Sequence, residues 1–249
     1  MTPTVLLLGG TTEAMRMGQA LAARGVRATI SLAGRVKSPA EQPLPVRIGG
    51  FGGVDGLVAH LKAEGVTHVI DATHPFAAQM SANAVDACDA LDLPLLALTR
   101  APWKAGAQDR WIHVPDMDGA VAALSGRPRR VFLALGRMNL PAFAAQPQHD
   151  YLLRLVDAPD RLPLPKAQVV IDRGPFEVEG DLALMRAHGT ELVVSKNAGG
   201  TGAQAKIVAA RKLRLPVVMI DRPAIPARAE AHDVEEVLDW LHGETARGV

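Results

Sequence analysis

A turn near the amino terminus combines glycine and threonine in a pattern typical of loops that bind phosphate groups. The turn, Gly9-Gly10-Thr11-Thr12-Glu13-Ala14, directly follows an aliphatic run and opens an amphipathic segment. Glycine lets the backbone approach a pyrophosphate closely, and the amino end of a helix offers unpaired N–H groups and a partial positive charge. Since the turn departs from Gly-x-Gly-x-x-Gly, a structural turn with Thr11 or Thr12 as the helix N-cap is an equal alternative. On the first interpretation, residues 9–14 bind a dinucleotide.

Ser31 and Arg35 come after the second aliphatic run and indicate which dinucleotide the turn would bind. A site for NAD usually carries a carboxylate about twenty residues beyond its glycine turn, whereas this chain has Ser31-Leu32-Ala33-Gly34-Arg35 there. Because no carboxylate would repel a 2′-phosphate, Ser31 and Arg35 favour NADP over NAD. A solvated loop charge is the alternative for Arg35 and the favoured interpretation of Lys37.

Two more loops follow predicted strands and therefore face the edge of a parallel sheet at which open α/β sheets bind ligands. In Asp71-Ala72-Thr73-His74-Pro75-Phe76, Thr73 could bond the cofactor or cap the next helix, and His74 could donate a hydrogen bond or a proton. In Gly49-Gly50-Phe51-Gly52-Gly53, Gly50 is expected to contact a flat ligand, with a plain turn as the alternative.

The second half of the chain contains a glycine turn with basic and amide side chains. In Ser195-Lys196-Asn197-Ala198-Gly199-Gly200, Lys196 and Asn197 could hold carboxylates or polarise a conjugated imine, backed by N–H groups of the two glycines. A structural turn is the alternative, and Lys206 in the next helix could assist or be solvated. Arginines also follow predicted strands in this half and suggest a polyanionic ligand: Arg137, Arg173 and Arg222.

Short aliphatic runs alternate with amphipathic segments, which is the pattern of βαβ units that form parallel sheets. Strands are expected at Thr4–Leu8, Ala28–Leu32, Val46–Ile48, Val66–Asp71, Leu95–Leu98, Trp111–Val114, Arg130–Ala134, Tyr151–Val156, Gln168–Asp172, Glu191–Ser195 and Val217–Ile220. Helices are expected at Thr12–Ala23, Val54–Glu64, Phe76–Leu91, Met117–Leu124, Phe176–His188, Gly202–Leu213 and Val234–Leu241.

The stretch 101–106 contains proline and glycine and interrupts this alternation after Arg100, which predicts a domain boundary there. We therefore expect an α/β fold with two Rossmann-like domains, residues 1–100 and 101–249. Each domain would be a mainly parallel sheet flanked by helices. The first would bind the cofactor and the second the substrate, with the active site in the cleft between them.

The composition argues against several classes of function. Lysine plus arginine total 27 and aspartate plus glutamate 26, so the net charge of +1 gives no support for binding nucleic acid or an acidic membrane. The single cysteine, Cys88, excludes an internal disulfide, and scattered histidines argue against a catalytic metal. Neither a membrane-spanning run nor a signal peptide is found, so a soluble, cytoplasmic protein is expected.

Taken together and in order, these motifs resemble the precorrin-6A reductase family of cobalamin biosynthesis. The resemblance spans almost the whole chain and depends most on residues 71–77 and on the Lys196-to-Gly200 turn. The other matching segments are residues 9–14, Arg173-Gly174-Pro175-Phe176, Lys206 and Asp221-Arg222-Pro223. Arg100-Ala101-Pro102-Trp103 resembles the family's linker with a shifted proline, which adds Arg100 to the residues expected to bind substrate. Ala198 stands where a serine is common.

The resemblance implies that NADPH reduces precorrin-6A, a tetrapyrrole with acetate and propionate groups, to precorrin-6B. It implies His74 as the acid that protonates the macrocycle, with Lys196 as the competitor, unless the substrate arrives already protonated. Cobalt-precorrin-6A is an alternative substrate, and a monomer or a small homo-oligomer is expected.

Three further classes remain as alternatives. The chain could be an NADP-dependent reductase of another substrate, a nonenzymatic NADP-binding regulator, or a methyltransferase that uses S-adenosylmethionine. The predicted convergence of His74, Arg137, Lys196 and Arg222 argues against the regulator.

Overall fold

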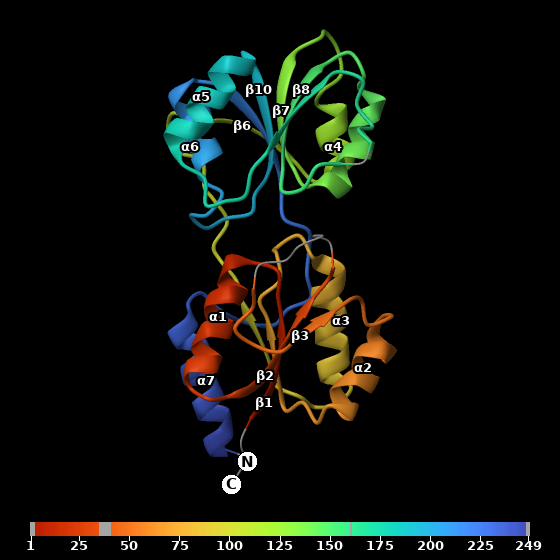
Figure 1. The fold of residues 1–249 in the computed structure, drawn as a ribbon, viewed down its shortest axis with the longest axis vertical. Coiled ribbons are helices and arrows are strands. Elements are labelled where there is room, and N and C mark those ends of the chain that lie inside the picture. The colour runs from red at the N-terminus through yellow and green to blue at the C-terminus, as the bar shows by residue number, and fades with distance from the viewer. Residues whose placement is uncertain (1–2, 35–40, 160, 248–249) are drawn as a thin grey trace. The chain divides into compact units, whose positions relative to one another are not determined.

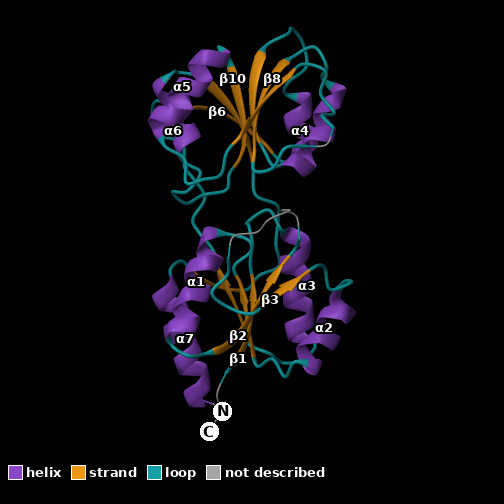
Figure 2. Ribbon diagram, in the orientation of Figure 1, coloured by secondary structure: helices purple, strands orange, loops and turns teal. Residues whose placement is uncertain are grey.

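The chain forms two compact α/β units, each built on its own parallel sheet (Figures 1 and 2). A computed structural model describes residues 3–34, 41–159 and 161–247. The first unit comprises Met1–Arg100 and Ala224–Val249, and the second comprises Ala101–Pro223. No helix among the described residues is long and apolar enough to cross a bilayer.

The first unit has a six-stranded sheet in the order β12-β5-β4-β1-β2-β3. Its strands are β1 (Thr4–Leu8), β2 (Arg27–Leu32), β3 (Val46–Ile48), β4 (His68–Asp71), β5 (Leu95–Leu98) and β12 (Ala229–Ala231), and every pairing is parallel. Its helices are α1 (Thr12–Ala23), α2 (Val54–Ala63), α3 (Ala78–Asp89) and α7 (Val234–Arg247). From β1 the strand order runs outward to β2 and β3, and from β4 it runs outward to β5 on the other side. The boundary between β1 and β4 is therefore the switch point at which such sheets bind ligands.

Alternating side chains of the first strand explain why helices cover both faces of this sheet. Val5 and Leu7 pack in one core with residues of α1 and α7, whereas Leu6 and Leu8 pack in another with residues of α2 and α3. Successive side chains of a strand point to opposite faces, so a strand that is buried on both sides reads as a continuous aliphatic run. Both cores therefore hold β1 in place and fix the turn that follows it.

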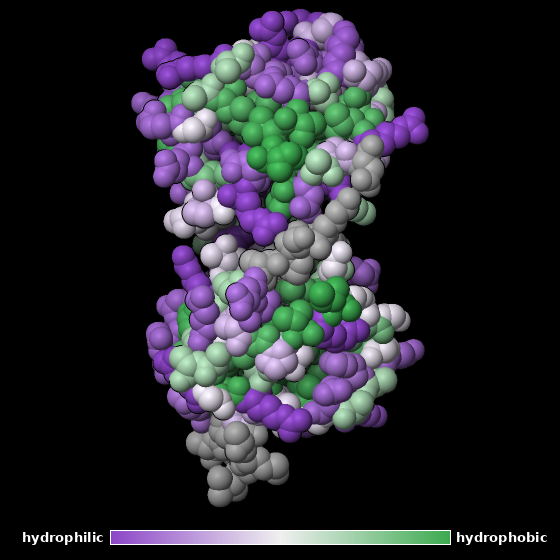
Figure 3. Space-filling view, viewed as in Figure 1, coloured by the Kyte–Doolittle hydropathy of each residue, from purple (hydrophilic) through white to green (hydrophobic). Residues whose placement is uncertain are grey.

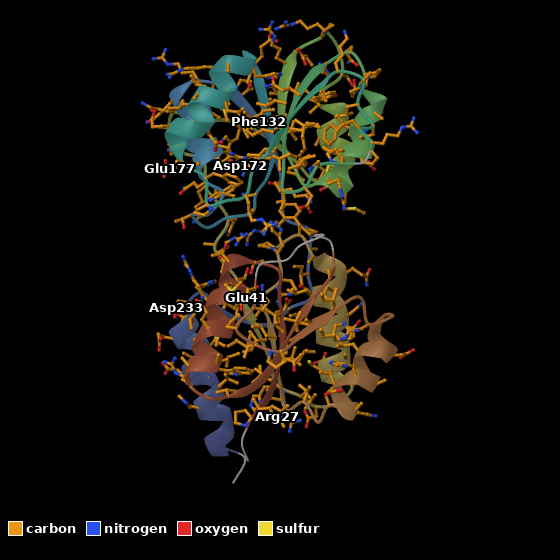
Figure 4. All side chains as sticks on the ribbon, viewed as in Figure 1. Arg27, Glu41, Phe132, Asp172, Glu177 and Asp233 are labelled. Carbon is orange, nitrogen blue, oxygen red and sulfur yellow. The ribbon has the colours of Figure 1, made fainter. Side chains whose placement is uncertain are left out.

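The second unit repeats this arrangement with the order β6-β11-β10-β7-β8-β9, again with parallel pairings only. Its strands are β6 (Arg110–Val114), β7 (Arg130–Ala134), β8 (Asp150–Leu155), β9 (Ala167–Ile171), β10 (Leu192–Lys196) and β11 (Pro216–Ile220). Its helices are α4 (Met117–Ala122), α5 (Val178–His188) and α6 (Ala205–Lys212), with a 3-10 helix, η1 (Arg137–Ala145). Phe132, at the centre of this unit in Figure 4, lies in the core that α5 and α6 cover.

An edge strand of each sheet comes directly after a crossing of the chain between the units. After β5 the chain leaves the first unit and forms β6 beside β11, and after β11 it returns and forms β12 beside β5. The expected second domain of residues 101–249 is therefore wrong at its carboxyl end, since residues 224–249 belong to the first unit. The predicted helix at residues 234–241 covers the first sheet, because Val237, Leu238 and Leu241 pack in the core of α1.

The other predicted elements are confirmed, most within two residues of their expected bounds, although α6 begins at Ala205 rather than Gly202. The short strand β12 and the 3-10 helix η1 were not predicted. Figure 3 shows apolar side chains at the surface of both units. The exposed apolar residues include Ile48 on edge strand β3, which is 60% exposed, and Ile171 on edge strand β9, which is 51% exposed.

Candidate active site

The first glycine turn and the loop after β4 lie side by side at the switch point of the first sheet. Leu8 and Asp71, the last residues of β1 and β4, are register partners. The Thr11 hydroxyl donates a 2.7 Å hydrogen bond to the carbonyl of Ala72, which ties the two loops together. The same oxygen accepts from Ala14 N at 3.0 Å, so Thr11 is the N-cap of α1. Its side chain is thus committed to structure, and a ligand would meet mainly backbone N–H groups there.

The two glycines of this turn serve different ends. A Cβ on Gly9 would lie 2.8 Å from Ile30, so glycine is needed for the turn to pack on β2. Gly10 has φ +109° and open space where a Cβ would be. Gly10 therefore permits the turn and leaves room for a group above it, as a pyrophosphate site requires. The role of residues 9–14 in binding a cofactor stays a prediction.

Asp71 is a buried carboxylate that organises the loop after β4. It accepts hydrogen bonds from Thr73 N (3.0 Å), Thr73 Oγ1 (2.6 Å) and Ser81 Oγ (2.6 Å). Arg228 lies 3.3 Å from Asp71 as an ion pair whose side chains are only 8% and 1% exposed. Sequence reasoning missed Arg228, because only the return of the chain to the first unit brings it to Asp71.

These contacts decide one of the alternatives for Thr73. Ala77 is the N-cap of α3 and no side chain caps that helix, so the prediction that Thr73 caps it is wrong. The Thr73 hydroxyl donates its O–H to a hydrogen bond with Asp71 and therefore presents oxygen lone pairs to any further partner. A bond between Thr73 and the cofactor stays a prediction, now with Thr73 as acceptor.

His74 is half-buried at the same loop. Its Nδ1 accepts a hydrogen bond from Phe76 N at 3.2 Å, so the neutral ring carries its proton on Nε2. Protonation of the ring would require Nδ1 to give up this bond. The arrangement presents the neutral ring as a hydrogen-bond donor through Nε2.

Arg100 and Glu13 form an ion pair within the first unit. Arg100 Nη1 lies 2.5 Å from a carboxylate oxygen of Glu13 in the first turn of α1. Burial raises the pKa of Glu13, but the hydrogen bond from Arg100, a backbone hydrogen bond and the charge of Arg100 outweigh burial, so the pKa is lowered on balance. Arg100 was expected to bind substrate and Glu13 to contact the cofactor. Both roles stay predictions, and the pair shows that Arg100 also neutralises an acid beside the glycine turn.

The expected 2′-phosphate site is described in part. Ser31 is buried at the end of β2, and Arg35 and Lys37 lie outside the described residues. Arg47 of β3 donates to Ser31 Oγ at 3.3 Å and to the carbonyls of Gly49 and Gly50 at 2.7 Å each. Sequence reasoning missed Arg47, although its place one residue before the end of a strand was visible.

At the switch point of the second sheet the candidate residues are cationic. Leu133 and Ala134 of β7 pair with Val194 and Ser195 of β10. Lys196 ends β10 and donates from Nζ to Asn139 Oδ1 of η1 at 2.9 Å. Arg137 begins η1, is half-exposed, and forms no ion pair with any described residue. Arg137, which follows β7, and Lys196, at the end of β10, therefore lie at the carboxyl ends of neighbouring strands.

The glycine turn after β10 is held by its own side chains. Asn197 is only 6% exposed, and its amide accepts from Trp103 N at 2.8 Å and donates to Trp103 O at 3.0 Å. Arg222 donates to the carbonyls of Asn197 and Ala198, each at 3.0 Å, and Trp103 Nε1 donates to Gly200 O at 2.7 Å. These contacts fit the structural alternative for Asn197 and Arg222.

Gly199 and Lys206 complete this turn. Gly199 has φ +71°, and a Cβ there would lie 2.2 Å from the carbonyl oxygen of Ala101. Lys206 is buried, donates to Ala203 O at 2.7 Å and lies 5.2 Å from the Trp103 ring centroid. Substrate contacts of Asn197, Gly199, Gly200 and Arg222 stay predictions. The structure describes each unit by itself, and the expected active site between the domains stays a prediction as well.

Two Rossmann-like sheets with loops of this kind define an α/β protein of the class that binds nucleotides at its switch points. Residues 4–242 match the model of the family described as precorrin-6x reductase CbiJ/CobK, and the chain belongs to this family. It is a reductase of cobalamin biosynthesis, as the resemblance indicated, and this family uses a nicotinamide cofactor.

Individual relatives support this membership across the whole chain. The chain is 60% identical to a precorrin-6A reductase from Rhodobacter capsulatus, over 98% of this chain and 99% of the relative. A precorrin-6A reductase from Mycobacterium tuberculosis H37Rv is 42% identical over 98% of this chain and 99% of its own length. A cobalt-precorrin-6A reductase from Priestia megaterium is 28% identical over 97% and 99%. A solved structure of CobK precorrin-6A reductase matches with a TM-score of 0.93 at 60% identity, covering 97% of this chain and 96% of that chain.

Proposed function

We propose that this protein transfers a hydride from NADPH to the macrocycle of precorrin-6A and yields precorrin-6B. The observation that carries the proposal is the 60% identity, over nearly the full length of both chains, to a precorrin-6A reductase. The metal-free substrate is favoured over its cobalt complex, since five precorrin-6A reductases are 42% to 60% identical to this chain and three cobalt-precorrin-6A reductases are 26% to 28% identical.

In this proposal the first unit holds the cofactor. The amino end of α1 and the open space above Gly10 fit a pyrophosphate, which helix N–H groups and the helix dipole stabilise. Thr73 Oγ1 donates its O–H to Asp71, so its lone pairs can accept a hydrogen bond from an amide such as the nicotinamide carboxamide. When bound, NADPH supplies the hydride, and this chain's residues supply orientation and charge.

The second unit contributes positive charge for the substrate. Arg137 and Lys196 lie at the carboxyl ends of neighbouring strands at its switch point, and they fit acetate or propionate groups of a tetrapyrrole. Arg137 would bind a carboxylate with its planar fork, and Lys196, oriented by Asn139, would act as a point charge. Lys196 also remains a candidate for polarising the conjugated system that accepts the hydride.

The proton that completes the reduction has two candidate sources on the protein. His74 donates from Nε2 in the tautomer that its bond to Phe76 N selects, so we assign it a hydrogen bond to substrate in preference to full proton transfer. Lys196 is the alternative donor. Hydride and proton together would add two hydrogens to the macrocycle, with the oxidised nicotinamide as the other product.

Anaerobic oxidation of NADPH by the purified protein, with and without precorrin-6A, tests this function. We expect the absorbance of the reduced nicotinamide to fall only when precorrin-6A is present, and the product mass to rise by two hydrogens. Turnover of cobalt-precorrin-6A alone would contradict the choice of substrate. Turnover of precorrin-6A with NADH as readily as with NADPH would contradict the choice of cofactor.

A further inference from the structure

Arg47 occupies the place at which a Rossmann-like sheet meets the adenosine ribose of its cofactor. Arg47 on β3 is the register partner of Ser31 on β2, and its Nη1 lies 3.3 Å from Ser31 Oγ. In dinucleotide-binding sheets the residues at the end of the second strand contact the 2′ position of that ribose. The third strand therefore places a guanidinium beside the residue that the second strand offers there.

The guanidinium of Arg47 is held in a fixed orientation. Its Nη1 and Nη2 donate to the carbonyls of Gly49 and Gly50, both at 2.7 Å, and its Cζ lies 3.8 Å from the ring centroid of Phe51. A flat cation that is stacked on an aromatic ring and bonded to two carbonyls keeps little rotational freedom. The Gly49–Gly53 loop thus orients Arg47, which gives this glycine-rich segment a role that its composition alone left open.

Arg47 still has donors for a ligand. A guanidinium has five N–H groups, and the bonds to Ser31, Gly49 and Gly50 use three of them. The Nε–H and one N–H of Nη2 remain without a partner among the described residues. Arg211 of the same chain binds both carboxylate oxygens of Asp109 through these two atoms, at 2.9 and 2.8 Å. The same pair on Arg47 fits two oxygens of a phosphate.

The charge of Arg47 also has no counter-ion within the described part of the chain, where no carboxylate pairs with it. Burial lowers the pKa of His60, and the positive charge of Arg47 lowers it further. His60 packs against Phe51 with ring centroids 5.1 Å apart. A half-buried cation that is held in one orientation and is not neutralised by the protein would be stabilised by a bound anion.

We propose that Arg47, together with Ser31, binds the 2′-phosphate of NADPH and so selects it over NADH. This inference rests on the proposed function and adds a residue that its sequence motifs did not contain. Arg47 acts from the third strand, independently of any contribution by Arg35.

Binding constants for NADPH and NADH, measured on the same preparations by nicotinamide fluorescence, test the proposal. The variants are Arg47→Met, which keeps the length of the side chain and removes its charge, Arg47→Lys, which keeps the charge, and Ser31→Ala. Arg27→Met is the matched control, because Arg27 is exposed at the opposite end of β2 (Figure 4). We expect Arg47→Met to weaken NADPH binding roughly 10- to 100-fold and NADH binding less than about threefold, with Arg47→Lys in between.

A purely structural role of Arg47 gives a different result. If Arg47 only held the glycine loop, Arg47→Met would weaken the binding of NADPH and of NADH by the same factor. That outcome would overturn the proposal. A second measurement uses adenosine 2′,5′-bisphosphate and adenosine 5′-monophosphate as competitors of bound NADPH. The variant should lose the preference of the wild type for the bisphosphate, and a retained preference would also overturn the proposal.

The wild type separates failure of this inference from failure of the proposed function. Wild-type selectivity for NADPH that survives in Arg47→Met refutes the role of Arg47 and leaves the proposed function intact. A wild-type protein that binds NADPH and NADH equally, or neither, refutes both the proposed cofactor and Arg47 as its selector.

Discussion

The two units of this protein share the order of five strands, β5-β4-β1-β2-β3 and β11-β10-β7-β8-β9, but build switch points of opposite chemical character. In the first unit β1 ends at Leu8 and continues as Gly9-Gly10-Thr11, small residues that open a helix. In the second, β7 ends at Ala134 and continues as Leu135-Gly136-Arg137, a larger and more basic sequence that opens a 3-10 helix. The first offers backbone N–H groups to a closely approaching anion, and the second offers side-chain cations that reach farther from the backbone.

The strands beside these turns differ in the same way. Strand β4 ends at Asp71, a buried carboxylate that accepts hydrogen bonds from its own loop. Strand β10 ends at Lys196, which donates a hydrogen bond to Asn139. Fold and topology therefore do not decide what a switch point binds, because a few side chains after two neighbouring strands do. This comparison predicts that each switch point can be impaired separately.

The largest expected effect is on the Asp71 cluster of the first unit. Asp71→Asn leaves the buried guanidinium of Arg228 without its counter-charge, which should lower the free energy of unfolding by about 3 to 5 kcal/mol. Urea unfolding measures this loss. Asp86→Asn, at an exposed position on α3, is the matched control and should change stability by less than about 0.5 kcal/mol.

A double variant sharpens this prediction. Asp71→Asn combined with Arg228→Met removes both charges, so it should be less destabilised than the sum of the two single variants. Strict additivity would show that the 3.3 Å ion pair contributes no coupling to the stability of the first unit.

A substitution at the switch point of the second unit should weaken the binding of substrate and leave the binding of cofactor unchanged. Arg137→Met removes a half-exposed cation that has no counter-ion among the described residues, so we expect the KM for precorrin-6A to rise roughly tenfold or more. The dissociation constant for NADPH should stay unchanged. Arg186→Met, on exposed α5 surface, is the control. Equal losses in NADPH and substrate binding would contradict the division of roles between the two switch points.

Most of the fold was predictable from the sequence, because strands buried on both faces must be continuous aliphatic runs. The runs Thr4–Leu8 and Arg130–Ala134 therefore mark strands almost without ambiguity. The strand Ala229–Ala231 has a short, mostly exposed sequence with no such run, and its place beside β5 depends on a chain crossing that no local pattern records. The same crossing determines which sheet α7 covers.

The candidate site was predictable where chemistry follows a strand end and unpredictable where it depends on distant partners. Gly10, Thr73, Arg137 and Lys196 could be named as candidates because each lies at or shortly after the end of a strand. Arg228 was missed because its partner, Asp71, lies far away in the sequence. Asn197 looked like a ligand residue, but its amide bonds the backbone of Trp103, a contact that only the folded chain reveals.

A smaller effect is expected when the two loops of the first switch point are uncoupled. Thr11→Val removes the N-cap of α1 and the 2.7 Å bond to Ala72 while it keeps the side-chain shape. We expect a loss of about 1 to 2 kcal/mol in unfolding free energy, together with weaker NADPH binding. Thr12→Val, at the exposed first position of α1, controls for the effect of valine on stability. Equal stability of the two variants would show that the cap does not couple the loops.

The smallest expected effect is a difference in pH dependence caused by Glu13. The folded-state pKa of Glu13 is lowered, despite burial, by its hydrogen bond to Arg100 and the charge of that residue. A carboxyl whose pKa is lowered in the folded state stabilises the protein at pH values above its ordinary pKa, which is 4.5 for glutamate. This stabilisation is lost as the pH falls through the pKa of the folded state. Glu13→Gln has no such carboxyl.

The stability advantage of wild type over Glu13→Gln should therefore be greatest near neutral pH and shrink as the pH falls below 4.5. Urea midpoints of both proteins across this range measure it. His60, whose pKa is also lowered, titrates in both proteins, so its contribution cancels in the difference. An advantage that is independent of pH would mean that Arg100 does not favour the charged form of Glu13. The inference that Arg100 neutralises an acid beside the glycine turn would then be contradicted.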